Sequence, residues 1–155
     1  MEILYLEWSK VDEAIWTMCD IIKREYEFDV IVGISRGGLI PAVRISHIFD
    51  NKRLLLMEAK YYKDIGVRDD KPKISLAFKK EDVTGKKVLL VDDVADTGGT
   101  LAAVKEHIES LSPKELKVAV VASKPISIVK PDYTVFNTDK WIIFPWEKMP
   151  VEKKK

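Results

Sequence analysis

Residues 88–100, which read VLLVDDVADTGGT, constrain the fold of this chain more than any other segment. They begin with an uninterrupted apolar run rich in β-branched residues, as expected for a parallel strand that is buried on both faces. Two adjacent acids, Asp92 and Asp93, follow that run, and a glycine-containing turn then opens an amphipathic helix. The segment therefore predicts a strand–turn–helix unit of an α/β protein, with two carboxylates at the sheet edge where open α/β folds bind ligands.

The turn after the two acids has the chemistry of an anion site. Residues 96–100 offer small side chains, hydroxyl groups and backbone N–H groups at a helix N-terminus, a combination that holds a phosphate well. The two acids can bind polyol hydroxyls or a metal ion. One segment thus predicts recognition of a sugar phosphate, which needs both kinds of contact. The alternative is a strand that ends in a solvated acidic turn, with Thr97 as an ordinary helix cap.

Strand-like and helix-like patterns alternate along the rest of the chain. The predicted helices span about 10–26, from the turn at 37–38 to about 49, and the residues after 97. The predicted strands span 28–34, 54–59, 74–78, 87–91 and 116–122. This alternation favours a parallel β-sheet flanked by helices on both faces. We expect a single domain over residues 1–155, with a core at about 9–122 and a small C-terminal hood, rich in proline and aromatic residues, at about 123–150.

Composition argues against several classes of protein. The 155 residues are 46% hydrophobic and 33% charged, which is typical of a soluble globular chain, and the formal net charge of +1 leaves no basic excess for nucleic acid. No basic-then-apolar leader and no apolar run of membrane-spanning length is present. The single cysteine, Cys19, fits a reducing compartment, and its apolar neighbours predict a buried helical thiol. We expect a cytoplasmic protein with no nucleic-acid or membrane partner; the lack of Gln and the abundance of Lys and Glu hint at a thermophilic source.

A second candidate anion site follows the strand predicted at 28–34. Ser35, Arg36, Gly37 and Gly38 form a strand-to-helix turn whose backbone N–H groups can hold an anion, and the Arg36 guanidinium adds a bidentate donor. The other interpretation is an ordinary turn whose glycines serve packing. Two anion sites at neighbouring strand ends would match a substrate that carries a phosphate at each end.

Two further segments carry groups that suit a planar base. Lys124 follows the strand predicted at 116–122 and can donate to a carbonyl oxygen, although a surface lysine before a proline is an equally good interpretation. Trp141 and Ile142 lie in an aromatic-rich stretch. That stretch either closes the fold as a hydrophobic cluster or supplies an aromatic face for stacking and free backbone groups for reading the edge of a base.

Residues 88–100 resemble the phosphoribosyl-pyrophosphate (PRPP) motif of the type I phosphoribosyltransferases. Further along, the order of Lys124-Pro125, Asp132-Tyr133 and residues 141–147 resembles the C-terminal part of bacterial xanthine–guanine phosphoribosyltransferases. The resemblance covers nearly the whole chain and points to the 6-oxopurine enzymes. It implies a pentosyltransferase of purine salvage that transfers 5-phosphoribosyl from PRPP to xanthine, guanine or hypoxanthine, giving the nucleoside monophosphate and pyrophosphate.

The same resemblance implies a role for each candidate residue. Asp96 is expected to accept the proton of purine N7, and Asp93 to bind Mg²⁺ directly or through water. Lys124 is expected to contact the exocyclic oxygen of the base, Trp141 to stack on it, and Ile142 to meet its edge through the backbone. The residues expected to bind PRPP and its phosphates are Ser35, Arg36, Gly37, Gly38, Asp92, Asp93, Ala95, Asp96, Thr97, Gly98, Gly99 and Thr100.

The resemblance implies three further features. The turn at 35–38 should contain a strained non-proline peptide bond, such as a cis one. The polar segment at 60–72 should close over the bound sugar and exclude water, with Arg68 and Lys73 as candidates for reaching pyrophosphate. A homo-oligomer, dimer or tetramer, is also expected.

Two other functions stay open at this point. One is a regulator that keeps this fold to sense PRPP while it controls a nucleic acid or a partner protein, although the chain shows neither a basic face nor an added DNA-binding segment. The other is a phosphoribosyltransferase with a pyrimidine acceptor, against which the pairing of Lys124 with Trp141 argues only by analogy.

Overall fold

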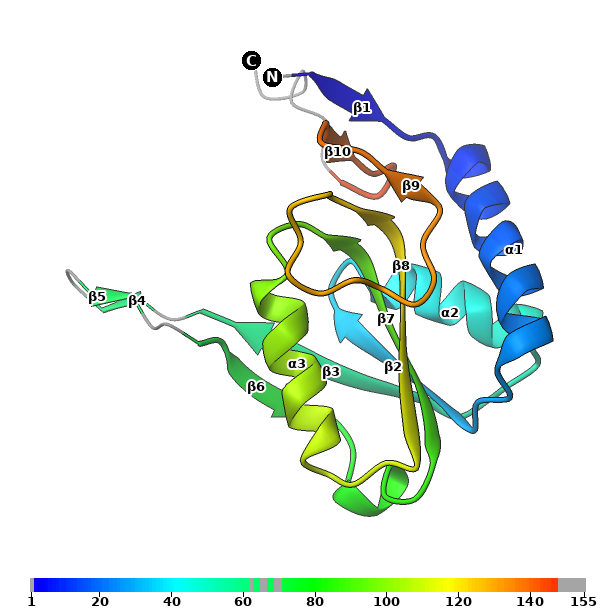
Figure 1. The fold of residues 1–155 in the computed structure, drawn as a ribbon, viewed down its shortest axis with the longest axis vertical. Helices are drawn as coiled ribbons and strands as arrows, with labels where there is room; N and C mark the ends of the chain where they lie inside the picture. Colours follow the sequence, from blue (N-terminus) through cyan, green and yellow to red (C-terminus); the bar gives the residue numbers. More distant parts are fainter. Residues whose placement is uncertain (1, 62, 65–66, 69–70, 148–155) are drawn as a thin grey trace.

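The computed structural model describes residues 2–61, 63–64, 67–68 and 71–147 (Figure 1). Its main sheet has six strands in the order β6-β3-β2-β7-β8-β9. The strands are β2 (Val30–Ser35), β3 (Leu54–Lys60), β6 (Lys73–Leu76), β7 (Lys87–Ala95), β8 (Glu115–Ser123) and β9 (Phe136–Asn137). All neighbours pair parallel except β6, which runs antiparallel to β3 at one edge. The prediction of a parallel α/β sheet is confirmed, with one reversed edge strand that the sequence pattern did not reveal.

Helices cover both faces of this sheet, as predicted. Helices α1 (Trp8–Glu25) and α2 (Leu39–Ile48) pack on one face, and α3 (Gly99–Glu109) packs on the other (Figure 1). A short 3₁₀ turn, η1 (Lys80–Asp82), precedes β7. The side chains of β7 alternate between the two faces: Leu89 and Val91 join the core under α1 and α2, whereas Val88 and Leu90 join the core under α3. This double burial explains why the strand is uninterruptedly apolar.

Helix α1 forms because apolar residues recur at helical spacing. Its buried side chains are Val11, Ala14, Ile15, Met18, Cys19 and Ile22. Cys19 is buried on α1, so the prediction of a buried helical thiol is confirmed, and burial raises the pKa of this thiol to about 12. The helix begins at Trp8, two residues before the predicted start at about residue 10. The Glu7 carbonyl accepts hydrogen bonds from the Lys10 and Val11 N–H groups, and no side chain caps this end.

Strand β7 continues past the predicted end at Val91 as far as Ala95. Its pairing with β2 stops at Val91, opposite Gly33, whereas its pairing with β8 continues to Ala95, opposite Ser123. The two acids therefore lie within the strand, but on the side of β2 their backbone has no partner strand. That gap at the sheet edge is where the candidate site lies.

A small second sheet closes the hood. Strand β1 (Ile3–Tyr5) pairs parallel with β10 (Trp141–Ile143), so the first and last described parts of the chain lie side by side (Figure 1). A third pair, β4 (Lys63–Asp64) with β5 (Val67–Arg68), lies beyond β3 and β6 and away from the body of the molecule in Figure 1. The Arg68 side chain lies outside the described part of the chain, and the predicted closure of residues 60–72 stays a prediction.

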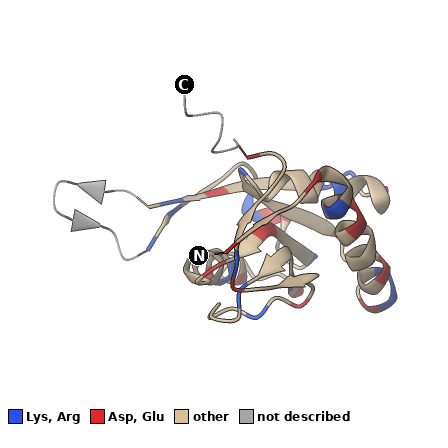
Figure 2. Ribbon diagram, turned by 90° about the horizontal axis from the view of Figure 1, so that it is seen from above, with Lys and Arg blue, Asp and Glu red and all other residues tan. Residues whose placement is uncertain are grey.

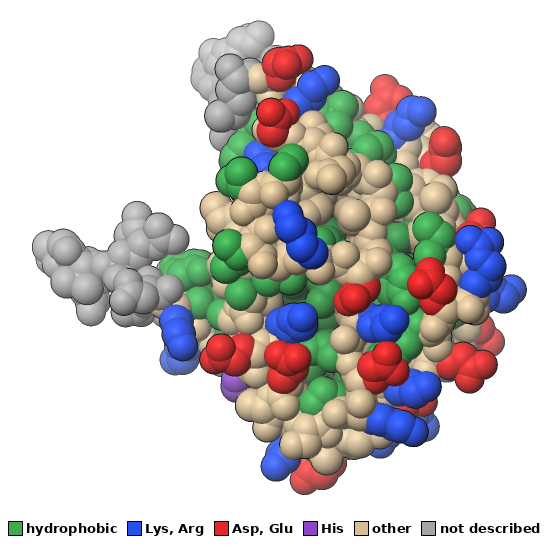
Figure 3. All heavy atoms as spheres, viewed as in Figure 1, with side chains coloured by type: hydrophobic (Ala, Val, Ile, Leu, Met, Phe, Trp, Pro, Cys, Tyr) green, Lys and Arg blue, Asp and Glu red, His purple; other side chains and the backbone are tan. Residues whose placement is uncertain are grey.

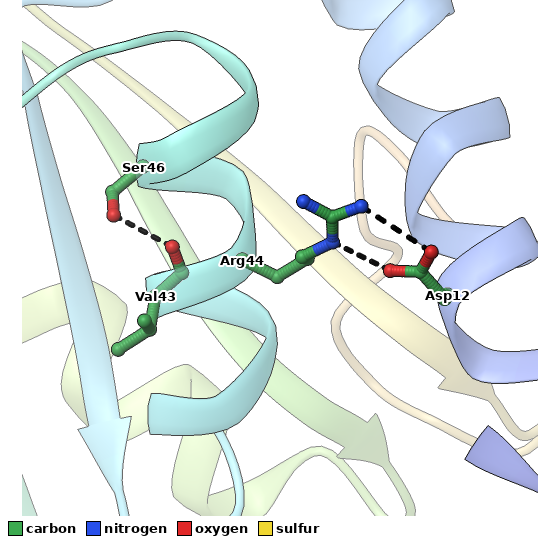
Figure 4. A network of polar contacts seen from close by, with 4 residues as sticks. All are labelled: Asp12, Val43, Arg44 and Ser46. Atoms are coloured by element: carbon green, nitrogen blue, oxygen red, sulfur yellow. Dashed lines mark hydrogen bonds and ion pairs between the residues drawn. The ribbon is translucent and has the colours of Figure 1, made fainter. Parts of the chain in front are cut away.

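An ion pair joins the two helices that share a face. Asp12 of α1 accepts hydrogen bonds from Arg44 of α2, with Nε at 2.5 Å from Oδ1 and Nη2 at 3.3 Å from Oδ2 (Figure 4). The Arg44 guanidinium also lies 5.3 Å from the centre of the Trp16 ring. Hydrogen bonding from Arg44 lowers the pKa of Asp12, which shows that the contact favours the ionised carboxyl.

Replacing Asp12 by asparagine should lower the thermal midpoint slightly at neutral pH, because both partners are partly exposed and solvent screens their attraction. A carboxyl whose pKa is lowered by folding stabilises the fold above its unfolded pKa, and this contribution is lost as the pH falls through the folded value. The difference between wild type and Asp12→Asn should therefore vanish in acid and shrink in high salt. Thermal melts at two pH values and two salt concentrations test this; a difference that persists in acid would contradict the ionic explanation.

Charges of both signs are spread over the surface. Positively and negatively charged residues occur together on the helices in Figure 2, and charged side chains of both signs are interspersed with apolar ones over the face shown in Figure 3. None of the described helices is both long and apolar enough to span a membrane.

Candidate active site

The two predicted anion turns meet at the end of the sheet. A side-chain carbon on Gly37 would overlap the carboxylate of Asp93, so the absence of a side chain at position 37 lets the turn after β2 lie directly against the acid pair of β7. Gly38, which is buried, caps the N-terminus of α2. The peptide bond between Ser35 and Arg36 is cis, as the family resemblance implies.

The acid pair is held by backbone groups. The Asp93 N–H donates to Asp92 Oδ1 at 2.8 Å, and the Val94 N–H donates to Asp93 Oδ1 at 2.8 Å. Burial raises the pKa of Asp92 well above its usual range, and the negative charge of Asp93 adds to this effect. A carboxyl pair under such mutual repulsion is stabilised by a cation or by hydroxyl donors. The site is therefore suited to a metal or to a polyol, as the sequence predicts.

The loop between β7 and α3 has the geometry of an anion cradle. Gly98 adopts a left-handed conformation with φ of 89° and is the N-cap of α3. The first hydrogen bond of the helix runs from the Ala102 N–H to the Gly98 carbonyl at 2.8 Å. The N–H groups at 99–101 are therefore not used by the helix backbone and point out of its N-terminus, where the Gly99 N–H donates to Thr97 Oγ1 at 3.4 Å. Thr97 is exposed and Thr100 half-buried at the same turn.

A second turn supports this loop from behind. The Ile128 N–H donates to the Thr97 carbonyl at 2.9 Å, and the Lys124 N–H donates to the Ala95 carbonyl at 2.9 Å. A side-chain carbon on Gly98 would lie 2.6 Å from Ser127 Oγ and 2.8 Å from the Ile128 nitrogen. Residues 124–128 therefore fix both ends of the anion loop. This contact joins two segments that are distant in the sequence, so no local sequence pattern predicts it.

Lys124, Asp96 and Trp141 come together from three segments. Lys124 Nζ lies 3.7 Å from Asp96 Oδ1 and 5.3 Å from the centre of the Trp141 ring. The lysine side chain is only 13% exposed, whereas that of Asp96 is 49% exposed. An ammonium group that lies between a carboxylate and an aromatic face, on a mostly buried side chain, can donate a hydrogen bond to a planar ligand seated beside it. Of the two interpretations of Lys124, the surface lysine is therefore wrong.

Two cavities adjoin these groups. The first, of about 150 Å³, is lined by Asp93, Val94, Asp96, Lys124, Trp141, Ile142, Phe144 and Glu147. The second, of about 530 Å³, is lined by Arg36, Gly37, Ile40, Asp93, Trp146 and Glu147. Asp93 and Glu147 line both. The structure thus places the three expected base-binding residues around the smaller cavity, and Arg36 and Gly37 of the turn at 35–38 around the larger one.

Glu147 is a site residue that the sequence patterns did not single out. Its backbone N–H donates to the Phe144 carbonyl at 3.0 Å, and its Oε1 accepts the Phe144 N–H at 2.8 Å. These bonds turn the chain after β10 so that the carboxyl group lies between the two cavities. Its only sequence signal is an acid in an aromatic stretch, which does not by itself distinguish a site residue from a surface one.

Comparison with known proteins places these features in a family. The model of the phosphoribosyl transferase domain matches residues 6–152. The crystal structure of a purine phosphoribosyltransferase from Pyrococcus horikoshii Ot3 is similar with a TM-score of 0.90 and 47% identity, over 99% of this chain and 100% of that one. A xanthine-guanine phosphoribosyltransferase from Ruegeria sp. (strain TM1040) is 27% identical over 92% of this chain and 84% of its own length. The transcriptional regulator GfcR from Methanococcus vannielii is 28% identical over 87% of this chain and 68% of its own length.

Proposed function

The chain belongs to the phosphoribosyl transferase domain family, and we propose that it transfers the 5-phosphoribosyl group of PRPP to a 6-oxopurine. Relatives of this chain are named xanthine-guanine phosphoribosyltransferases, which are glycosyltransferases, and a similar structure is that of a purine phosphoribosyltransferase. The products would be a purine nucleoside monophosphate and pyrophosphate. The acceptors to consider are xanthine, guanine and hypoxanthine.

One observation carries this proposal: the cavity beside the acid pair holds Lys124, Asp96 and Trp141 together. An aromatic face suits stacking on a flat ring, and the Lys124 ammonium suits an oxygen acceptor in the plane of that ring. The Asp96 carboxylate suits a ring N–H that must lose a proton. A 6-oxopurine presents both an exocyclic oxygen and such a nitrogen on one edge, which is why it fits better than a base without that pair.

The donor substrate would occupy the adjacent strand ends. The N–H groups at 99–101 and the hydroxyls of Thr97 and Thr100 would hold the 5′-phosphate. Asp92 and Asp93 would hold the ribose hydroxyls, since carboxylates accept hydrogen bonds from a polyol. The turn at 35–38, which touches Asp93, would hold pyrophosphate in the larger cavity, with Arg36 as its charged donor.

The residues present fit a magnesium ion that arrives with its substrate. Among the described residues, no group of three or more His, Cys, Asp or Glu side chains could hold a metal ion by itself. Mg²⁺ is commonly bound by one or two carboxylates together with substrate phosphates and water, and Asp93 beside the turn at 35–38 offers such a carboxylate. When bound there, the ion would neutralise charge on the leaving pyrophosphate.

The proposal is tested by incubating the protein with PRPP and Mg²⁺ and one base at a time: xanthine, guanine, hypoxanthine, adenine or uracil. We expect pyrophosphate release with at least one of the three 6-oxopurines and none with adenine or uracil. Release with uracil alone would replace the proposal by a pyrimidine acceptor. If none of the five bases supports pyrophosphate release but calorimetry shows PRPP binding, a regulator would be favoured.

A regulator remains the second candidate function, because the similarity to GfcR covers 87% of this chain. A sensor needs the donor site but not the base site. The contact between Lys124 and Trp141 therefore favours the enzyme, since it builds a pocket that PRPP sensing would not use. A cytoplasmic location and a homo-oligomeric assembly are further parts of the proposal; gel filtration with light scattering tests the second.

Replacing Lys124 by methionine should raise the KM for the base about 10- to 100-fold, because a hydrogen bond from a charged donor is worth about 1.5–3 kcal/mol. Methionine keeps the apolar stem that is buried next to Trp141. The KM for PRPP should change little. Steady-state kinetics with each substrate varied in turn measure both values, and Lys114→Met, at an exposed position, is the control. A rise in both KM values together would remove Lys124 from the base site.

A further inference from the structure

A charged pair on β3 adjoins the turn that would hold pyrophosphate. Strands β2 and β3 run parallel, and their register places Glu58 opposite Ser35, the last residue of β2 and the first of the turn at 35–38. Lys60 follows two residues later, so its side chain lies on the same face of the strand as that of Glu58. Lys60 Nζ lies 3.5 Å from Glu58 Oε2. The turn therefore has an acidic and a basic side chain beside it, both on the neighbouring strand.

This pair lies on an open part of the sheet. Met57 is buried in the core under α3, and side chains alternate along a strand, so Glu58 and Lys60 face the other way. Leu56, on the same face as the pair, is 39% exposed, which shows that solvent reaches this face of β3. The side chains of Lys60 and Glu58 are themselves 59% and 41% exposed. An ion from solution can therefore reach both.

A cavity of about 380 Å³ joins the pair to the turn. Its lining consists of Ser35, Arg36, Glu58, Ala59 and Lys60. Arg36 also lines the larger cavity that is proposed for pyrophosphate. Because one arginine borders both cavities, an anion bound to Arg36 would have the charged pair of β3 on its other side.

The arrangement of charges here is unexpected for an anion site. In the antiparallel pairing of β3 with β6, Lys60 lies opposite Lys73, and Glu58 lies opposite Ser75. Two like charges directly opposite each other on neighbouring strands repel, and a carboxylate two residues away offsets part of that repulsion. The same carboxylate would repel phosphate oxygens and compete with them for Lys60. Glu58 therefore has either a structural role or an effect on the anion.

We infer that Glu58 limits how tightly the enzyme holds pyrophosphate, and that it acts through Lys60. The inference rests on the proposed function, because it concerns the leaving group of that reaction. With pyrophosphate against Arg36, the phosphate oxygens and the Glu58 carboxylate compete for the Lys60 ammonium group. Lys60 thus strengthens binding of the product, and Glu58 favours its release. Glu58 is a positioning residue in this scheme and takes no part in the chemical step.

The test compares pyrophosphate binding by the wild-type chain, Lys60→Gln and Glu58→Gln, using calorimetry with Mg²⁺ present. Lys60→Gln should raise the Kd for pyrophosphate about two- to fivefold, and Glu58→Gln should lower it about two- to fivefold, as expected of partly exposed charges. Inhibition of the forward reaction by added pyrophosphate should change in the same two directions. Lys52→Gln and Glu81→Gln are the matched controls, since both residues line a cavity where β2 and β3 begin, at the opposite edge of the sheet.

The opposite signs separate this inference from a structural role. If Glu58 only keeps Lys60 and Lys73 apart, Glu58→Gln will lower the thermal midpoint and will weaken pyrophosphate binding or leave it unchanged; either binding result overturns the inference. A wild type that releases no pyrophosphate from PRPP with any purine base would remove the proposed function, and the inference with it. An active wild type whose variants bind pyrophosphate equally well would overturn the inference alone. If Glu58→Gln does not fold, Glu58→Thr, which suits a β-strand, is measured against the same criteria.

Discussion

Replacing Asp96 by asparagine should lower turnover by about 10²–10⁴-fold, the usual range for general base catalysis. Asp96 lines the small cavity, and its carboxylate lies 3.7 Å from Lys124 Nζ. An amide of the same size keeps the shape of the loop but cannot accept a proton from the purine. The fold and most of the PRPP affinity should therefore survive.

The measurement combines turnover at saturating substrates with PRPP binding by calorimetry. Asp139→Asn, which removes an exposed acid from the hood, is the control and should leave both values unchanged. Turnover by Asp96→Asn at the wild-type rate would exclude proton acceptance by this residue. A parallel loss of PRPP affinity would mean that Asp96 acts mainly in the anion loop.

Replacing Gly98 by alanine should weaken PRPP binding about 100-fold or more and also destabilise the fold. A left-handed conformation costs a residue with a side chain about 1–2 kcal/mol. At Gly98 the added carbon would also lie 2.6 Å from Ser127 Oγ and 2.8 Å from the Ile128 nitrogen. Because Ile128 donates to the Thr97 carbonyl, relief of this contact must move the anion loop or break that bond.

Gly85→Ala is the matched control for this variant. Gly85 has a φ of 72°, so it bears the same conformational cost, but an added carbon there would meet nothing within 4 Å. Chemical denaturation should show a loss of stability in both variants, whereas calorimetry should show weakened PRPP binding only in Gly98→Ala. Equal PRPP affinity of the two variants would contradict the anion role of the loop.

The parts of the fold that the sequence predicts are those encoded by local patterns. Strand β7, its acids and the turn before α3 follow from one continuous run of residues, and the buried face of α1 follows from helical spacing. Strand β1 is different, since its three residues become a strand only by pairing with β10, far away in the sequence. No periodicity can develop over so short a segment.

The same distinction applies to the candidate site. The residue types at 35–38 and 96–100 predict anion binding, because glycines and hydroxyl side chains before a helix can donate hydrogen bonds to an anion wherever they occur. The contact of Gly37 with Asp93 and the position of Glu147 depend on how separate segments pack. The predicted end of β7 at Val91 is wrong for a related reason: β7 continues to pair with β8 as far as Ala95, after its pairing with β2 has stopped at Val91.

In the proposed assignment, both sheets contribute to the site: the turns after β2 and β7 of the main sheet would bind the donor, and the ladder of β1 with β10 would help to bind the base. Asp96 and Lys124, which follow strands of the main sheet, and Trp141 and Ile142, which lie in the ladder, would together meet the base. Because Trp146 and Glu147, which follow this ladder, also line the larger cavity, substitutions near the chain ends would affect how both substrates are held.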